Sequence, residues 1–228
     1  MVDWSALADG LLPPRCRFCD QATPRLAMCE GCIAGLPWNR PACPRCAQPQ
    51  AHDAPCARCL RAPPPFDCAW AAFRLELPVH QEIHRLKYGA QFLSARTLGE
   101  LMARELLRRP EALPQRLLPV PLHSPRLRRR GYNQAVEIAR VLAQRTGVVV
   151  DVDSVERWRP TAHQTGQSRA QRRRNLKGAF RAHADLSGLR LALIDDVITT
   201  GATAGELARV CCAAGAARVE VWAAARTP

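Results

Sequence analysis

The sequence predicts an α/β fold, a mostly parallel sheet with helices on both faces, preceded by a small cysteine-rich module. Strand-like apolar runs alternate with helical patterns from residue 66 to residue 228, which is typical of parallel sheets covered on both sides. Eight cysteines in two equal groups precede this region. The proline-rich stretch 61–65 lies between the two parts and is expected to be stiff and extended. We therefore expect one domain at residues 1–64 and a second at 65–228.

The cysteine-rich module contains an internal repeat. Eight of the eleven cysteines follow the spacing CxxC, nine residues, CxxC, and the second copy starts 27 residues after the first. Two CxxC turns together supply the four thiolates of a tetrahedral structural Zn²⁺ site. We expect two structural zinc ions, each bound by one consecutive set rather than by interleaved sets. A disulfide framework is the alternative, but it does not suit a reducing compartment. The sets are Cys16, Cys19, Cys29 and Cys32, then Cys43, Cys46, Cys56 and Cys59.

The elements of the second part follow from hydrophobic periodicity. Strands are expected at 66–75, 117–120, 148–150, 191–194 and 218–224. Helices are expected after Pro78, near 92–108, after Gln134 and after Thr203. The stretch 157–180 is polar and basic, so we expect a loop there. The carboxyl ends of parallel strands meet at one edge of the sheet, where ligands bind in such folds.

The stretch LALIDDVITTGAT, residues 191–203, contains the most specific pattern in the chain. A short apolar strand is expected to end at Asp195 and Asp196, whose carboxylates suit a divalent metal or sugar hydroxyls. The small, hydroxyl-rich turn that follows leads into a helix. Free backbone N–H groups at such a helix start favour a phosphate. The alternative is an ordinary strand-to-helix turn with solvated carboxylates.

Positive charge is concentrated in one segment. The formal net charge is +13, and residues 122–181 hold thirteen arginines and one lysine against four acidic residues, a balance of +10. This segment predicts an anionic partner, either nucleic acid or pyrophosphate. The chain has 31 arginines and two lysines, and the planar arginine fork suits phosphate. A GC-rich genome would produce the same bias.

The acidic pair and its turn resemble the 5-phosphoribosyl diphosphate (PRPP) signature of type I phosphoribosyltransferases, an apolar strand followed by two acidic residues and T-T-G-x-T. The resemblance implies a type I phosphoribosyltransferase-like sheet that binds PRPP with Mg²⁺. By this resemblance Asp195 and Asp196 hold the ribose hydroxyls. The residues around the 5-phosphate would be Thr199, Thr200, Gly201, Ala202 and Thr203.

Further motifs narrow the resemblance. The runs PVPL and RRGYNQA, with the cysteine repeat in front and IDDVITTGAT behind, resemble the ComF family of competence-associated phosphoribosyltransferase-like proteins over nearly the whole chain. The family resemblance implies a pyrophosphate loop that includes Leu122 and His123. It also implies a lid within 157–180. Arg130 beside the loop and Arg174 in the lid would offset the charge of the leaving pyrophosphate.

The residues support two classes of function. One is a phosphoribosyltransferase that transfers ribose 5-phosphate from PRPP and releases pyrophosphate, although no segment identifies the acceptor. The other is an accessory protein of DNA uptake that binds single-stranded DNA or a competence helicase, with the PRPP site inactive or acting as a sensor. Residues 1–14 contain no basic residue and no sustained apolar run, and no stretch approaches a membrane span. We therefore expect a cytoplasmic protein without membrane insertion.

Overall fold

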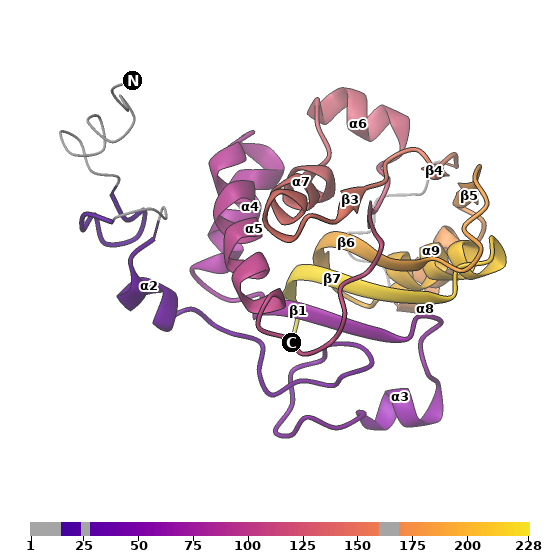
Figure 1. Cartoon of the computed structure of the whole chain (residues 1–228), viewed down its shortest axis with the longest axis horizontal. Helices are drawn as coiled ribbons and strands as arrows, with labels where there is room; N and C mark the ends of the chain where they lie inside the picture. The colour runs from indigo at the N-terminus through magenta and orange to yellow at the C-terminus, as the bar shows by residue number, and fades with distance from the viewer. Residues whose placement is uncertain (1–14, 24–27, 160–168) are drawn as a thin grey trace. The chain divides into compact units, whose positions relative to one another are not determined.

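A computed structural model of the chain describes residues 15–23, 28–159 and 169–228. The chain divides into two compact units, Met1–Pro37 and Trp38–Pro228 (Figure 1). Each unit contains one of the two cysteine sets. The second set thus belongs to the same compact unit as the sheet, while the domain boundary expected between residues 64 and 65 stays a prediction.

The first unit contains a turn and a short helix. An isolated antiparallel bridge joins Arg15 to Ala22, and helix α2 (Glu30–Ala34) follows. Cys29 is the N-cap of α2, and its sulfur accepts a hydrogen bond from the amide of Cys32 at 3.4 Å. Because the first amides of a helix have no partner inside the helix, a sulfur at the N-cap satisfies one of them.

The second cysteine segment packs against the sheet of its own unit. It contains helix α3 (Ala57–Arg61). Ala47 is buried in the same hydrophobic cluster as the sheet residues. The amide of Asn39 donates to the carbonyl oxygen of Ala72, within β1, at 2.9 Å. These contacts anchor the second cysteine set to the α/β region.

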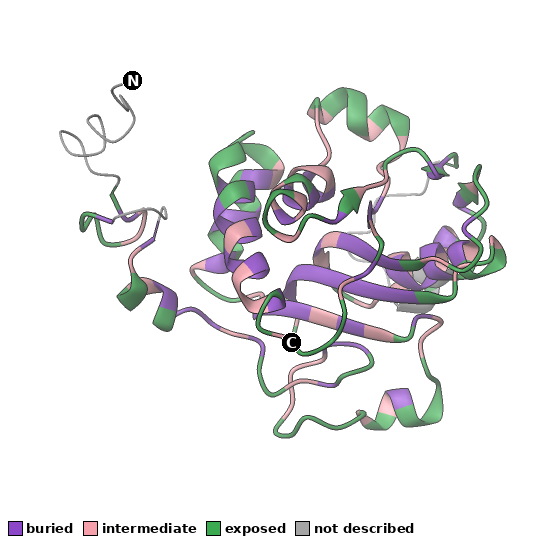
Figure 2. Cartoon of the chain, in the orientation of Figure 1, coloured by how far each residue is buried: buried purple, intermediate pink, exposed green. Residues whose placement is uncertain are grey.

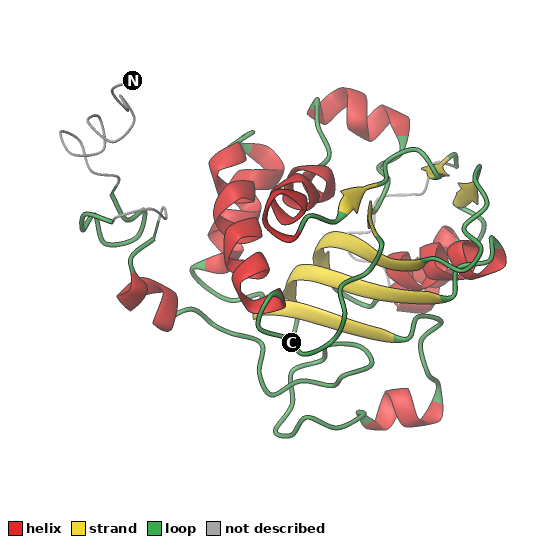
Figure 3. Cartoon of the chain, viewed as in Figure 1, coloured by secondary structure: helices red, strands yellow, loops and turns green. Residues whose placement is uncertain are grey.

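Five parallel strands form the central sheet in the order β1-β7-β6-β2-β3 (Figure 3). They are β1 (Cys68–Arg74), β2 (Arg116–Pro119), β3 (Val149–Val150), β6 (Arg190–Ile198) and β7 (Arg218–Arg226). The long strands β6 and β7 lie inside the sheet and are mostly buried, as expected where helices cover both faces. The fold class predicted from the sequence is confirmed.

Helices cover both faces of this sheet. Helix α5 (Phe92–Leu106) packs with α7 (Gln134–Thr146) on one face, and α9 (Ala202–Ala213) packs against β6 and β7 on the other (Figure 1). Gly99 permits the close approach of α5 to α7, because a Cβ atom there would lie 2.7 Å from Val141 Cβ. The other helices are α4 (Val79–Tyr88), α6 (Ser124–Arg130) and α8 (Arg169–Leu176). No helix within the described ranges combines the length and apolar character that crossing a membrane requires.

The core of the second unit fixes the position of β6 (Figure 2). Leu191 and Leu193 of β6 are buried with Val219 and Val221 of β7 and with Leu207 of α9. Burial of one such side chain contributes roughly 1.5–3 kcal/mol relative to exposure. The acidic pair therefore lies on one of the most firmly packed strands of the sheet.

Strand β6 is longer than the sequence predicts. It runs to Ile198, beyond Asp195 and Asp196, on which the sequence predicts it to end. Asp195 is in register with Ala223 of β7. Backbone pairing with a long neighbour thus extends the strand past the point where its side chains become polar. The sheet itself therefore holds the acidic pair.

Four further elements lie in segments where the sequence predicts neither a helix nor a strand. Helix α6 precedes α7, and α8 lies within the stretch expected to form a lid. Strand β4 (Val155–Arg157) pairs antiparallel with β5 (Phe180–Ala182). Basic residues dominate α6 and α8, so apolar periodicity gives no signal for these helices. Residues 160–168 of the expected lid lie outside the described residues.

Candidate functional site

Each cysteine set brings its four sulfur atoms together. Within each set, the Sγ atoms all lie within 4.8 Å of one another. The members are the four cysteines of one repeat in each case. The consecutive assignment predicted from the sequence is confirmed, and an interleaved assignment is excluded.

Four crowded thiols need a cation before all of them can be thiolates. Contacts with the sulfurs of Cys19 and Cys29 raise the pKa of Cys32 to about 12. Burial, and then contact with the Cys46 sulfur, raises the pKa of Cys59. A bound Zn²⁺ ion reverses this effect, because it stabilises the deprotonated form of each ligand. Both sets fit a structural four-thiolate zinc site.

A cleft of about 430 Å³ opens at the carboxyl ends of β2 and β6. This edge is where parallel α/β folds bind ligands. The cleft brings together six of the residues predicted from the sequence to form the site. They are Leu122, Arg130, Asp195, Asp196, Thr199 and Thr203.

The two aspartates of the cleft contact each other, and one of them forms an ion pair with a lysine. Asp196 is buried, with 8 % of its surface exposed, and its Oδ2 lies 3.0 Å from Lys87 Nζ. The amide of Asp196 donates to Asp195 Oδ1 at 2.9 Å. Burial, and then the charge of Asp196, raises the pKa of Asp195 to about 7. A divalent cation would offset this repulsion and favour the ionised form of both carboxylates.

The loop after β6 presents different residues to two separate spaces. Gly201 has a φ of 74° and is the N-cap of α9, so the N-cap residue itself offers no side chain to the first amides of the helix. The Thr200 hydroxyl accepts a hydrogen bond from the amide of Ala202 at 3.3 Å. Thr199 and Thr203 line the cleft, whereas Thr200, Gly201 and Ala202 line a second pocket. The helix start between the two spaces favours an anion.

A basic and aromatic wall closes the cleft on the side of α4 and α6. Arg130 donates from Nη1 to Gln134 Oε1 at 2.7 Å, and its guanidinium carbon lies 5.6 Å from the centre of the Tyr88 ring. Asn133 is the N-cap of α7 and donates from Nδ2 to the carbonyl oxygen of Val120 at 3.0 Å. This contact holds the end of α6 beside the end of β2 and keeps Arg130 at the cleft.

Five basic residues of the cleft are missing from the set predicted from the sequence. His80, His84 and Lys87 come from α4, and Arg126 and Arg157 come from α6 and β4. The spacing of the α4 residues places them on one helical face, which is a signal that the sequence does contain. Arg157 has no such signal, because the antiparallel pairing of β4 with β5 brings it to the cleft. Burial lowers the pKa of Arg157, so an anionic ligand beside it would be favoured.

Arg174 and His123 lie outside the cleft. Arg174, on α8, lines the second pocket, which has a volume of about 910 Å³. His123 is the half-buried N-cap of α6 and lines neither space. Their predicted places beside the leaving group and in the pyrophosphate loop stay predictions. Arg130 is the arginine of the predicted set that does line the cleft.

The chain is similar to known proteins over nearly its whole length. The family model of the double zinc ribbon domain matches residues 7–60. DNA utilization protein YhgH of Salmonella typhimurium is 36% identical over 223 residues, which cover 95% of this chain and 98% of that protein. Competence protein F of Haemophilus influenzae is 33% identical over 207 residues, which cover 87% of this chain and 90% of that protein.

Solved structures resemble part of the chain. Glutamine PRPP amidotransferase of B. subtilis aligns with a TM-score of 0.40 and 21% identity, over 57% of this chain and 26% of that chain. Purine phosphoribosyltransferase of Pyrococcus horikoshii aligns with a TM-score of 0.36 and 14% identity, over 64% of this chain and 84% of that chain. Both scores lie below 0.5, so the sheet topology itself remains the ground for the fold class.

Proposed function

Because the chain belongs to the ComF family, with competence protein F and DNA utilization protein YhgH among its relatives, we propose that its cleft binds PRPP with Mg²⁺ and that the protein has a role in DNA utilization. One observation carries the proposal: the paired carboxylates of Asp195 and Asp196 line the same cleft as Thr199 and Thr203, which flank the start of α9. Carboxylates suit a hard cation and ribose hydroxyls, and a helix start suits the 5-phosphate. The carboxylates would bind the ribose hydroxyls, and the start of α9 would bind the phosphate at the other end of ribose 5-phosphate.

The cations of the cleft support a pyrophosphate group as the third part of the ligand. Lys87, Arg126, Arg130 and Arg157 line the cleft, and its only acidic residues in the described part of the chain are the two aspartates. Four cations against two carboxylates leave an excess of two positive charges before a ligand enters. Arginine binds phosphate oxygens through two parallel hydrogen bonds. A ligand with several phosphate charges is therefore favoured over a neutral sugar.

In a transfer reaction, the bond between ribose C1 and a pyrophosphate oxygen breaks, and a nucleophile forms a new bond to C1. The transition state has oxocarbenium character, so placement of charge matters more than proton transfer. Asp195 and Asp196 would orient the ribose, and Arg130 would offset charge on the departing oxygen. Mg²⁺, when bound, would neutralise part of the pyrophosphate charge.

Isothermal titration calorimetry with PRPP and Mg²⁺ tests this proposal. We expect the wild type to bind, and the double variant Asp195→Asn with Asp196→Asn to lose at least about 100-fold in affinity, because two charged contacts disappear. The matched control is Asp153→Asn with Asp185→Asn, which removes two exposed carboxylates and should bind as the wild type does. Unchanged affinity in the first variant would refute the assignment of the cleft. Pyrophosphate release with candidate acceptors then separates a transferase from a sensor.

A second candidate function is binding of single-stranded DNA, and one surface favours it. Helix α6 has no buried residue and carries Arg128 and Arg129 on its last turn. Within the described residues, neither side chain forms an ion pair. An unpaired basic helix surface suits nucleic-acid phosphates. Aromatic residues make up only 5% of the sequence, so backbone contacts would contribute more than base stacking.

A further inference from the structure

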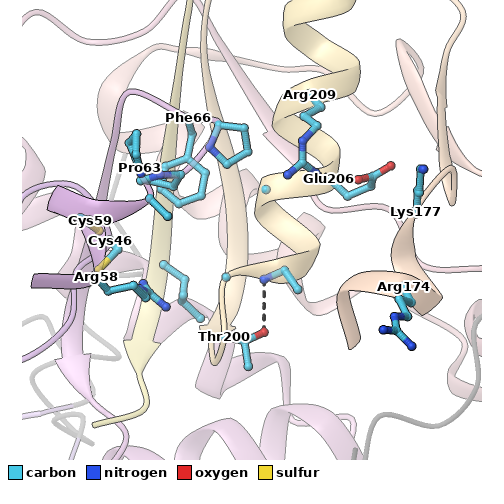
Figure 4. Close-up of a pocket in the computed structure, with 17 residues that line it drawn as sticks. Cys46, Arg58, Cys59, Pro63, Phe66, Arg174, Lys177, Thr200, Glu206 and Arg209 are labelled. Atoms are coloured by element: carbon cyan, nitrogen blue, oxygen red, sulfur yellow. Dashed lines mark hydrogen bonds and ion pairs between the residues drawn. The ribbon is translucent and has the colours of Figure 1, made fainter. Parts of the chain in front are cut away.

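A second pocket lies on the other side of the loop that follows β6. Its volume is about 910 Å³, and none of its lining residues lines the cleft. Thr200 and Gly201 of the loop form part of its lining (Figure 4). The second cysteine set and residues 63–66 form one wall, and α8 and α9 form the other. The pocket is therefore a separate space that shares a loop with the cleft.

Four cations line this pocket: Arg209, which pairs with Glu206, and three others. Arg58 comes from α3 on the side of the cysteine set, and Arg174 and Lys177 face it from the opposite side, in and just after α8 (Figure 4). None of the three forms an ion pair with a carboxylate among the residues that the structure describes. Cations that converge on one space without carboxylate partners repel one another. An anion between them would relieve that repulsion.

The negative groups of the pocket are already engaged. Glu206 is its one carboxylate in the described chain. Its Oε1 accepts from the amide of Gly178 at 2.7 Å, and its Oε2 accepts from Arg209 Nη1 at 2.8 Å. A zinc ion with four thiolates would have a net charge of about −2, but Arg58 and Arg226 flank that site. Arg174 and Lys177, on the side of α8, thus remain available to bind an anion.

One wall of the pocket is apolar. It consists of three successive prolines, 63–65, and Phe66. Gly205 of α9 permits the approach of Pro65, because a Cβ atom there would lie 3.3 Å from Pro65 Cγ. An inorganic anion would contact the cations and leave this wall empty. A ligand that uses both walls needs an apolar ring system attached to several negative charges.

We propose that this pocket binds a nucleoside polyphosphate, with the phosphates at Arg174 and Lys177 and the nucleoside against the proline wall. Arginine and lysine supply charged hydrogen bonds to phosphate oxygens. The volume lies in the range of roughly 300–1,000 Å³ that is typical of small-molecule sites, so it admits a complete mononucleotide. This site does not depend on PRPP binding in the cleft.

Calorimetry with ATP tests the proposal, in buffer that contains excess ribose 5-phosphate to compete for the cleft. Wild-type protein should bind ATP, and tripolyphosphate should bind at least about fivefold more weakly because it lacks the nucleoside. The double variant Arg174→Ala with Lys177→Ala should bind ATP at least about tenfold more weakly. Both side chains are exposed, so the variant should keep its fold, which its melting temperature checks.

The matched control is Arg61→Ala with Arg96→Ala, which removes two exposed cations that line neither space. It should bind ATP within about twofold of the wild type. Asp195→Asn with Asp196→Asn should also keep ATP affinity, so failure of PRPP binding is distinguishable from failure of this site. Absence of ATP binding to the wild type, unchanged affinity in the Arg174 and Lys177 variant, or displacement of ATP by ribose 5-phosphate would overturn the proposal.

Discussion

The guanidinium of Arg226 donates from Nε to the carbonyl oxygen of Cys46 at 3.2 Å and so joins the last strand to the second cysteine set. Its Nη2 donates to Gln48 Oε1 at 2.6 Å, and its Nη1 donates to the carbonyl oxygens of Ile198 and Thr199 at 3.1 and 2.5 Å. Arg226 is only 2 % exposed. One buried side chain therefore connects a cysteine set to the loop that borders both the cleft and the second pocket.

The first prediction concerns this connection. Arg226→Lys should lower the free energy of unfolding by about 2 kcal/mol or more, because an ammonium group cannot reach partners on three segments and leaves buried carbonyl oxygens unpaired. Urea unfolding measures this loss. Affinity for PRPP should also fall, because the loop after β6 loses its anchor. The matched control, Arg218→Lys, changes a half-exposed side chain paired with Glu220 on the same strand and should cost under about 1 kcal/mol. Equal losses in the two variants would contradict a special role for Arg226.

The second prediction concerns metal. Freshly purified protein should contain two equivalents of zinc by elemental analysis, because each of the two complete thiolate sets fits one ion. Zero or one equivalent would contradict the assignment. From the sequence alone, Cys16→Ser and Cys43→Ser are both expected to unfold the cysteine module and spare the region after it. The contact between Arg226 and Cys46 changes that expectation for the second set.

The two cysteine variants should therefore differ in their effect on the sheet. Cys43→Ser should increase amide hydrogen exchange in β6 and β7, because loss of zinc frees the segment that Arg226 holds. Cys16→Ser alters the other compact unit and should leave exchange in these strands unchanged. Exchange by mass spectrometry measures both variants. The same exchange in both would indicate that the second set does not support the sheet.

The sequence predicts the parts of the fold that depend on local pattern. The cysteine repeat, the apolar strands and the turn after Asp196 each have a spacing that one physical rule explains. The full length of β6 has no such local signal, because it depends on pairing between Asp195 and Ala223 of β7, a residue distant in the chain. The same holds for Arg226, which has no local motif and obtains its role from contacts with residues 28 and 180 positions away.

The residues of the candidate site divide in the same way. Asp195, Asp196 and the threonines of the loop belong to one continuous stretch, so the sequence predicts them together. Lys87 reaches Asp196 from another element, α4. Arg157 lies at the cleft because β4 pairs with β5, a strand more than twenty residues later. Arg174 is predicted by resemblance, but α8 places it on the other side of the loop. Long-range packing decides which basic residues face the cleft.

A third prediction concerns pH. The raised pKa of Asp195, about 7, exceeds the value of roughly 3.9 expected in the unfolded chain. The folded state therefore holds an extra proton between about pH 4 and 7, and the stability of the ligand-free protein should fall as pH rises through this window, by at most about 1.4 kcal/mol per pH unit. Urea unfolding at a series of pH values measures the slope. Asp195→Asn should flatten it, whereas Asp153→Asn should not. A slope that survives in Asp195→Asn would assign the proton to another group.

The last prediction separates the two classes of function. If α6 contacts DNA phosphates, each neutralised phosphate releases counterion, and log affinity for single-stranded DNA should fall with log salt by roughly 0.7 per contact. Arg128→Ala with Arg129→Ala should then flatten the slope by about 1.4 and weaken all sequences alike. Neither residue lines the cleft, so PRPP affinity should stay unchanged.

Arg61→Ala with Arg96→Ala removes the same charge elsewhere and tests whether net charge alone is responsible. Fluorescence anisotropy with labelled oligonucleotides at several salt concentrations measures these slopes. Absence of DNA binding by the wild type at low salt would remove the nucleic-acid function and leave PRPP binding as the activity of the cleft.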